Sequence, residues 1–185
     1  MAKIADVFPD IDDLGKGWGD FDTLPDGTMA VAKVIEVTGK QNRNGAMYGA
    51  VVIELTHIPA GLTGNFRPRI WDYGTFTTPG AVDPTLPEDE ATKARKKAGM
   101  WARRVTALGL NPKEVDTDWD AAQVGAFYLP AVGVSVIVRL GFEPADGQYR
   151  AKNTARDYFP DTDAMRVKHH LSLAVDRAAT FEVEL

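Results

Sequence analysis

The chain has 185 residues, of which 44% are hydrophobic and 25% charged, as is ordinary for a folded domain with a core of its own. It contains no cysteine, which excludes disulfides and cysteine-ligated zinc sites. It also lacks an apolar run of the ~20 residues that a membrane helix needs and, at its start, the apolar region of a signal peptide. We therefore expect a cytoplasmic protein with no membrane partner.

The formal net charge of −5 is concentrated near the N-terminus. Residues 1–30 hold seven aspartates against two lysines, so the rest of the chain is balanced. A domain with no net charge can still bind nucleic acid through a basic groove, because affinity depends on local phosphate contacts rather than on total charge. We expect residues 1–28 to form an acidic, partly ordered N-terminal arm.

The first regular pattern predicts a β-hairpin. Residues 29–38 are rich in β-branched residues and predict a strand, and Asn44-Gly45 is a strong signal for a tight turn. Residues 46–58 then predict the returning strand. The connection, residues 39–46, carries Lys40 and Arg43 and should present a polar, basic tip.

The third predicted strand, residues 66–76, is the most informative stretch. Because side chains alternate between the faces of a strand, Arg67, Arg69, Trp71 and Tyr73 share one face. Two arginines make full burial of that face unfavourable. Cations for phosphates and flat rings for bases suit a single-stranded nucleic acid. The alternative is an ordinary strand with a half-buried tryptophan and two solvated arginines.

Two helices should follow. Pro87 and the acidic residues after it predict a helix start, and Gly109 predicts its end. Over 88–109, apolar residues at spacings of three and four, Trp101 among them, predict a core-facing stripe. The opposite, solvated side should carry Lys93, Lys96, Lys97, Arg103 and Arg104. Residues 113–127 predict a second short helix, with Val115, Trp119, Ala122 and Phe127 facing inward.

A second hairpin completes the pattern. Residues 131–143 alternate with a period of two, Asp146-Gly147 predicts a turn, and residues 148–157 predict the returning strand. Arg150 and Lys152 share one face of that strand, which repeats the basic face of the third strand. Residues 161–185 form a C-terminal segment in which 164–175 suit helix and strand equally.

This order of elements is that of an OB-fold. The predicted fold class is mainly β: a five-stranded OB-fold barrel over residues 29–160, with a helical insertion of about 84–127 between the third and fourth strands. Apolar residues should fill the barrel: Val31, Ile35, Val51, Ile53, Ile70, Val134, Val136 and Val138. The binding face of such a barrel lies on its second and third strands and on two hairpin loops, here residues 39–46 and 144–148.

Three stretches carry a resemblance to a known family: Val-Ile-Glu-Val-Thr with a later Val-Val-Ile-Glu-Leu, then Gly-Val-Ser-Val-Ile-Val-Arg-Leu, then Asp-Gly-Gln-Tyr followed by Ala-Arg-Asp-Tyr-Phe-Pro. The chain resembles bacteriophage single-stranded DNA-binding proteins with an OB-fold over roughly residues 29–160. The resemblance implies that it coats transient single strands in phage replication or recombination. The resemblance does not decide whether the protein forms a homo-oligomer or contacts replication proteins, and both remain possible partners. Bacterial proteins of this type often end in an acidic tail, whereas here the C-terminus is only weakly acidic and the acidic segment is N-terminal.

The sequence shows no catalytic signature. His169 and His170 are adjacent and would diverge on a strand or a helix, so they make a poor metal pair. There is no His-Glu-x-x-His motif and no phosphate-binding loop of the Walker type. The acidic run at residues 10–13 is better explained as solvated charge than as a cation site. We expect no enzyme activity, no metal and no cofactor.

The sequence therefore predicts a sequence-tolerant binder of single-stranded DNA. The alternative is a β-barrel module for protein–protein interaction, such as a replisome or virion adaptor. The predicted nucleic-acid-binding residues are Lys40, Arg43, Tyr48, Arg67, Arg69, Trp71, Tyr73, Arg150 and Lys152.

Overall fold

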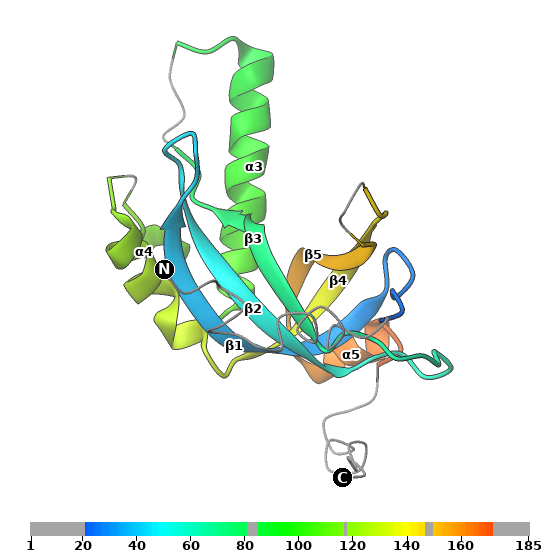
Figure 1. The fold of residues 1–185 in the computed structure, drawn as a ribbon. Helices are drawn as coiled ribbons and strands as arrows, with labels where there is room; N and C mark the ends of the chain where they lie inside the picture. The colour runs from blue at the N-terminus through cyan, green and yellow to red at the C-terminus, as the bar shows by residue number, and fades with distance from the viewer. Residues whose placement is uncertain (1–20, 81–84, 117, 147–149, 172–185) are drawn as a thin grey trace, which may run out of the picture.

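The computed structural model describes residues 21–80, 85–116, 118–146 and 150–171, and its architecture is mainly β (Figure 1). Five strands form one sheet in the order β3-β2-β1-β4-β5, and each neighbouring pair is antiparallel. The strands are β1 (Met29–Gln41), β2 (Met47–His57), β3 (Arg69–Thr77), β4 (Ser135–Glu143) and β5 (Lys152–Pro160).

The predicted first hairpin is confirmed. β1 and β2 pair from Val31 opposite His57 to Gln41 opposite Met47. In the loop between them, the Asn42 side chain accepts hydrogen bonds from the backbone N–H groups of Asn44 and Ala46. Gly45 has φ 82°, a left-handed conformation that favours glycine. The β4–β5 pairing is also as expected, although residues 147–149 of its turn lie outside the described residues.

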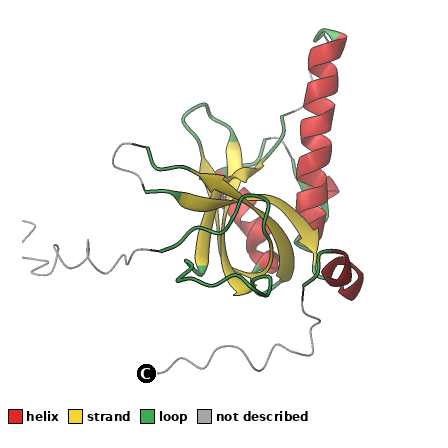
Figure 2. Cartoon of the chain, turned by 90° about the vertical axis from the view of Figure 1, so that its right-hand side faces the viewer, coloured by secondary structure: helices red, strands yellow, loops and turns green. Residues whose placement is uncertain are grey.

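The sheet is strongly curved, so that its two edge strands approach each other (Figures 1 and 2). β3 and β5 are the two edge strands, four antiparallel steps apart in the order of the sheet. Side chains join them: Thr75 Oγ1 donates to the carbonyl of Ala155 (3.0 Å), and the Tyr158 hydroxyl donates to Asp72 (2.9 Å). Within the described residues no backbone ladder connects β3 to β5, so the sheet is not closed. We call this boundary the seam.

The connection between β3 and β4 is helical, as predicted, and its helices pack on the sheet. It holds α3 (Glu88–Ala107), a 3₁₀ turn η1 (Pro112–Glu114), α4 (Ala121–Tyr128) and a second 3₁₀ turn η2 (Leu129–Ala131). α3 contacts β3 and β5, and α4 contacts β1 and β2. The two helices meet in the core, where Trp101 Nε1 donates to the Tyr128 hydroxyl (3.1 Å).

A glycine on β1 allows α4 to lie this close. A Cβ added to Gly39 would stand 1.8 Å from the carbonyl oxygen of Ala121, a backbone atom that cannot move aside without displacing the helix. A larger residue would therefore push α4 off the sheet.

A short helix, α5 (Asp163–Lys168), shows that the ambiguous stretch 164–175 begins as a helix, while residues 172–175 lie outside the described residues. Val31 and Ile137 pack there with Leu171 in a small cluster separate from the main core. The buried Arg166 side chain donates to Asp161 (Nη2 to Oδ2, 2.7 Å), and Ser135 Oγ donates to the same carboxylate. A buried arginine is tolerated because it is paired and hydrogen-bonded.

Two of the residues predicted to fill the barrel, Val31 and Ile35 on β1, are not in the main core. The main core takes Ala30, Ala32 and Val34 from this strand, whereas Val31 points toward Leu171, and Ile35 is only half-buried outside both clusters. Both faces of β1 are covered near its start, so alternation alone did not show which face lines the interior. The core residues predicted on the other strands are confirmed. The main core contains Val51, Ile53, Ile70, Val136 and Val138, and Val134 packs against it.

The insertion also differs from prediction in two details. The second helix begins only at Ala121, because Asp120 and Gln123 form a capping box there, and it buries Val124 and Tyr128 while Ala122 is exposed. Arg104 does not belong to a solvated side of α3. Its guanidinium donates to Asp157 and to the backbone carbonyl of Arg156.

No helix in the described part of the chain is both long and apolar enough to cross a membrane.

Candidate functional site

The structure places a cavity of about 420 Å³ at the seam, on the side where β3 and β5 begin. Six of the nine predicted binding residues line it: Arg67, Arg69, Trp71, Tyr73, Arg150 and Lys152. The first four come from β3 and its approach, and the other two from β5 and its approach. The two basic faces that the sequence predicted separately thus face one common space.

Side chains, and not a backbone ladder, join the described residues of the two edge strands. The bonds run from Thr75 to Ala155 and from Tyr158 to Asp72. The cavity lies along this boundary, between residues 67–73 and 150–154. An unzipped boundary with polar and aromatic side chains on both sides leaves a polar, ring-lined opening.

The segment before β1 closes part of this opening. Phe21, Asp22 and Thr23 line the cavity. The backbone N–H of Asp22 donates to the carbonyl of Asn65, and the N–H of Asn65 donates back to the Asp22 carboxylate. Residues 21–23 thus lie against the approach to β3, and we call them the N-terminal wall.

Both predicted stacking rings are accessible. Trp71 is 39% exposed and Tyr73 is 51% exposed, so neither belongs to the core. The Arg67 guanidinium carbon lies 4.7 Å from the centre of the Trp71 ring, and Lys40 Nζ lies 5.2 Å from the centre of the Tyr73 ring. Cations at this distance are attracted by the ring quadrupole. Each ring therefore lies beside a cation, so a nucleotide could stack its base on the ring and place its phosphate near the cation.

Two of the predicted cations have carboxylate partners that the sequence analysis did not identify. Arg69 pairs with Glu54 (3.3 Å) and Lys152 with Glu143 (3.1 Å), each directly across a strand pair. The four side chains are 39–60% exposed to solvent. Exposed ion pairs contribute only about 0–1 kcal/mol. A phosphate can replace the carboxylate at little cost, but it must compete for the cation.

The remaining three predicted residues, Lys40, Arg43 and Tyr48, do not line the cavity. Lys40 reaches the site through its contact with Tyr73. Tyr48 is half-buried on β2, directly opposite Lys40 in the register. Arg43 is exposed in the β1–β2 loop, beyond the ends of both strands.

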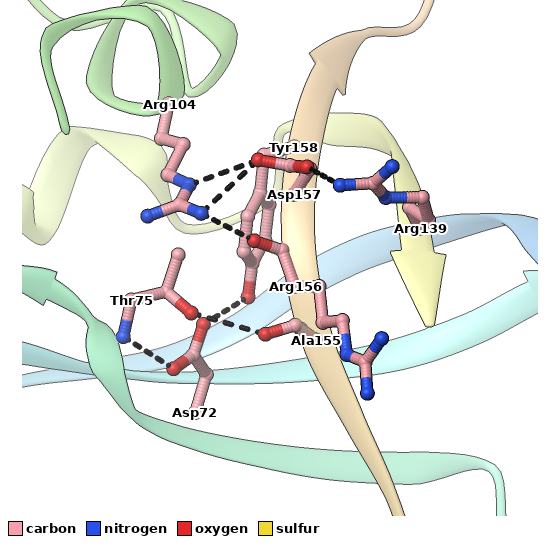
Figure 3. A network of polar contacts seen from close by, with 8 residues as sticks. All are labelled: Asp72, Thr75, Arg104, Arg139, Ala155, Arg156, Asp157 and Tyr158. Atoms are coloured by element: carbon pink, nitrogen blue, oxygen red, sulfur yellow. Dashed lines mark hydrogen bonds and ion pairs between the residues drawn. The ribbon is translucent and has the colours of Figure 1, made fainter. Parts of the chain in front are cut away.

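A buried polar network fixes the seam beneath the site (Figure 3). Asp72, which is buried, accepts hydrogen bonds from the backbone N–H groups of Gly74 and Thr75 as well as from Tyr158. Burial, followed by the nearby Asp72 charge, raises the pKa of Tyr158, so the phenol stays protonated and remains a donor. Asp72 lies between Trp71 and Tyr73 in the chain, so this network holds the strand that presents both rings.

A second set of ion pairs lies farther along β5. Asp157 accepts from Arg104 of α3 and from Arg139 of β4, and thereby ties the helix to the sheet (Figure 3). These arginines have a structural partner and line no part of the cavity.

Sequence reasoning missed the N-terminal wall and the polar residues of β5 in the cavity, Asn153 and Thr154. Phe21 lies in the predicted N-terminal arm, and nothing local indicated that it would line a cavity with β3 residues. Neither ion pair followed from the sequence. A two-residue turn at Asp146-Gly147 would place Glu143 opposite Arg150, whereas the structure pairs it with Lys152. The loop between β2 and β3 does not define a register for Glu54 and Arg69.

Comparison with models of protein families finds no match for this chain. Comparison with curated proteins finds none either. Among the described residues, no group of three or more histidine, aspartate or glutamate side chains is placed to hold a metal ion.

Proposed function

We propose that this protein binds single-stranded DNA, without sequence preference and without catalysing a reaction, in the cavity at the seam. One observation carries the proposal: two exposed rings, Trp71 and Tyr73, share a cavity with four cations from two strands. Rings that accept any base and cations that follow the backbone are the two requirements of sequence-tolerant single-strand binding.

The proposal includes the fold and the biological setting. A curved sheet whose two edge strands approach each other, and a helical connection between β3 and β4, are consistent with an OB-fold barrel. In that fold the seam would be the meeting of the third and fifth strands. Together with the resemblance to phage single-stranded DNA-binding proteins, this supports a role in phage replication or recombination.

The polar groups of the cavity support the lack of sequence preference. The Asn153 amide is the group there best suited to reading a base edge. Its oxygen accepts from the N–H of Leu24, and its nitrogen donates to the carbonyls of Leu24 and Gly141. An amide engaged in this way is poorly placed to pair with one chosen base, which leaves stacking and phosphate contacts as the binding forces.

A protein partner is the second candidate. The ion pairs Arg69–Glu54 and Lys152–Glu143 make the rim mixed in charge, and exposed tryptophan, tyrosine and arginine are the residues enriched at protein interfaces. Such an interface would bury the same rings. The two candidates differ in their response to salt, because only nucleic-acid binding releases condensed counterions.

The test is a titration of fluorescently labelled oligo-dT at several salt concentrations. Each phosphate contact on a single strand contributes roughly −0.7 to the slope of log affinity against log salt. With the four cations of the cavity and Lys40 engaged, we expect a slope of about −3 to −4. Arg69→Gln should reduce the slope by one contact, whereas Arg103→Gln on the exposed side of α3 should leave it unchanged. No binding at low salt, or a slope near zero, would contradict the proposal.

A further inference from the structure

Phe21 is held at the cavity by the residues that follow it. Asp22 exchanges two hydrogen bonds with Asn65, ahead of β3. Leu24 exchanges two with the Asn153 side chain on β5, and its own side chain is fully buried in the main core. Residues 22–24 thus bridge the two edge strands. The position of Phe21 is set by this bridge and not by burial of its own ring.

The Phe21 ring lines the cavity and remains accessible. It is 39% exposed, the same fraction as Trp71, and it lines the same opening as Trp71 and Tyr73. Apolar rings of this size usually go to the core, and Leu24, three residues later, does so. An accessible phenylalanine among two other accessible rings and several cations suits contact with a ligand better than packing.

We infer that Phe21 is a third base-stacking residue, so that the cavity receives unpaired bases between rings supplied by β3 and by the N-terminal wall. This inference rests on the proposed function. It extends the site from one strand face to a cleft with rings from two separate segments. A base in such a cleft must expose its flat face, which paired and stacked bases in a duplex do not do. The cleft would therefore select single strands over duplexes.

The chain offers a matched control for this residue. Phe142, on β4, is 38% exposed but does not line the cavity. Substituting either residue removes the same ring from a similarly exposed position. A difference between the two variants therefore reports the cavity and not a general loss of apolar surface.

The test measures oligo-dT binding, duplex binding and melting temperature for Phe21→Leu, Phe21→Trp and Phe142→Leu. Leucine keeps apolar volume without a ring, so the fold should survive. Phe21→Leu should weaken oligo-dT binding about tenfold, as expected for one lost stack, with an unchanged salt slope and melting temperature. Phe21→Trp should bind as the parent or tighter, and Phe142→Leu should stay within about twofold of the parent.

The outcomes separate this inference from the proposed function. If the parent binds oligo-dT with a steep salt slope and Phe21→Leu binds equally well, Phe21 is no stacking residue and the proposed function stands. If Phe21→Leu loses affinity only in proportion to a fall in melting temperature, its role is structural and the inference is wrong. If the parent does not bind oligo-dT at all, the proposed function fails and this inference with it.

Discussion

At the scale of single residues, Trp71 and Asp72 show how one strand serves two environments. Trp71 faces the cavity with its ring beside Arg67, while Asp72 points inward and accepts a hydrogen bond from Tyr158. Alternation along β3 makes this possible. The buried carboxylate is tolerated because two backbone N–H groups and a phenol donate to it.

Because Trp71 is exposed while Asp72 is buried, we expect a substitution at Trp71 to weaken DNA binding without lowering the stability of the fold. Trp71→Ala should weaken oligo-dT binding by about tenfold or more, since a stacked base contributes ~1–3 kcal/mol. The melting temperature should change little, because the ring is exposed. Tryptophan emission should be quenched when oligo-dT is added to the parent, and the quench should shrink in the variant.

Trp119 provides the comparison for that variant. It packs at the core margin against Phe127 (ring centres 5.7 Å apart) and lies outside the cavity. Trp119→Ala should lower the melting temperature and preserve the quench. A large loss of stability in Trp71→Ala with unchanged DNA affinity would place Trp71 among the packing residues and remove the main support for the proposed function.

At the scale of elements, Trp101 joins α3 to α4 within the insertion. Trp101 is 7% exposed and is in the main core, as the apolar stripe predicted. Its indole N–H donates to the Tyr128 hydroxyl of α4, so the same side chain supplies apolar burial and a buried hydrogen bond between the helices.

Trp101→Ala should therefore destabilise the protein by about 3–5 kcal/mol, the usual cost of deleting a large core aromatic. Chemical denaturation checks this value, and Met100→Ala, at an exposed position on the same helix, should cost far less. The folded fraction of Trp101→Ala should keep its DNA affinity, because Trp101 does not line the cavity. A variant that kept its stability and lost DNA binding would make α3 part of the site.

At the scale of the whole molecule, two buried tyrosines link stability to alkaline pH. Burial raises the pKa of Tyr128 and of Tyr158 above the value near 10 of an exposed phenol. Below pH 10 both phenols are neutral in the folded and the unfolded chain, so their contribution is fully present. Above pH 10 the unfolded chain loses these protons first, so the free energy of unfolding falls as pH rises.

The expected slope is up to about 1.4 kcal/mol per pH unit for each tyrosine. Urea denaturation between pH 8 and about pH 11 measures it, and the double variant Tyr128→Phe, Tyr158→Phe should show a shallower decline over that range. An equally steep decline in the double variant would assign the alkaline loss to other groups.

Much of the fold followed from local patterns in the sequence. Turn dipeptides, alternation and an apolar stripe with end signals predicted five strands in order and a helix between the third and fourth, because each of these features depends on neighbours only a few residues apart. The same reasoning placed Arg67, Arg69, Trp71 and Tyr73 on one face of the third predicted strand, and in the structure all four line the cavity.

The tertiary structure alone decided which of these faces meet. Arg150 and Lys152 share a cavity with Trp71 because the sheet is curved and brings its two edge strands together. These strands are far apart in the sequence: Thr75 and Ala155, which are hydrogen-bonded, are 80 residues apart. Phe21 reached the cavity through hydrogen bonds to Asn65 and Asn153 made by residues after it, with no periodic signal. The local sequence determines which side chains share a face of a strand, but long-range packing determines which other residues lie opposite that face. For that reason the rings were predictable from the sequence, whereas the cavity that holds them was not.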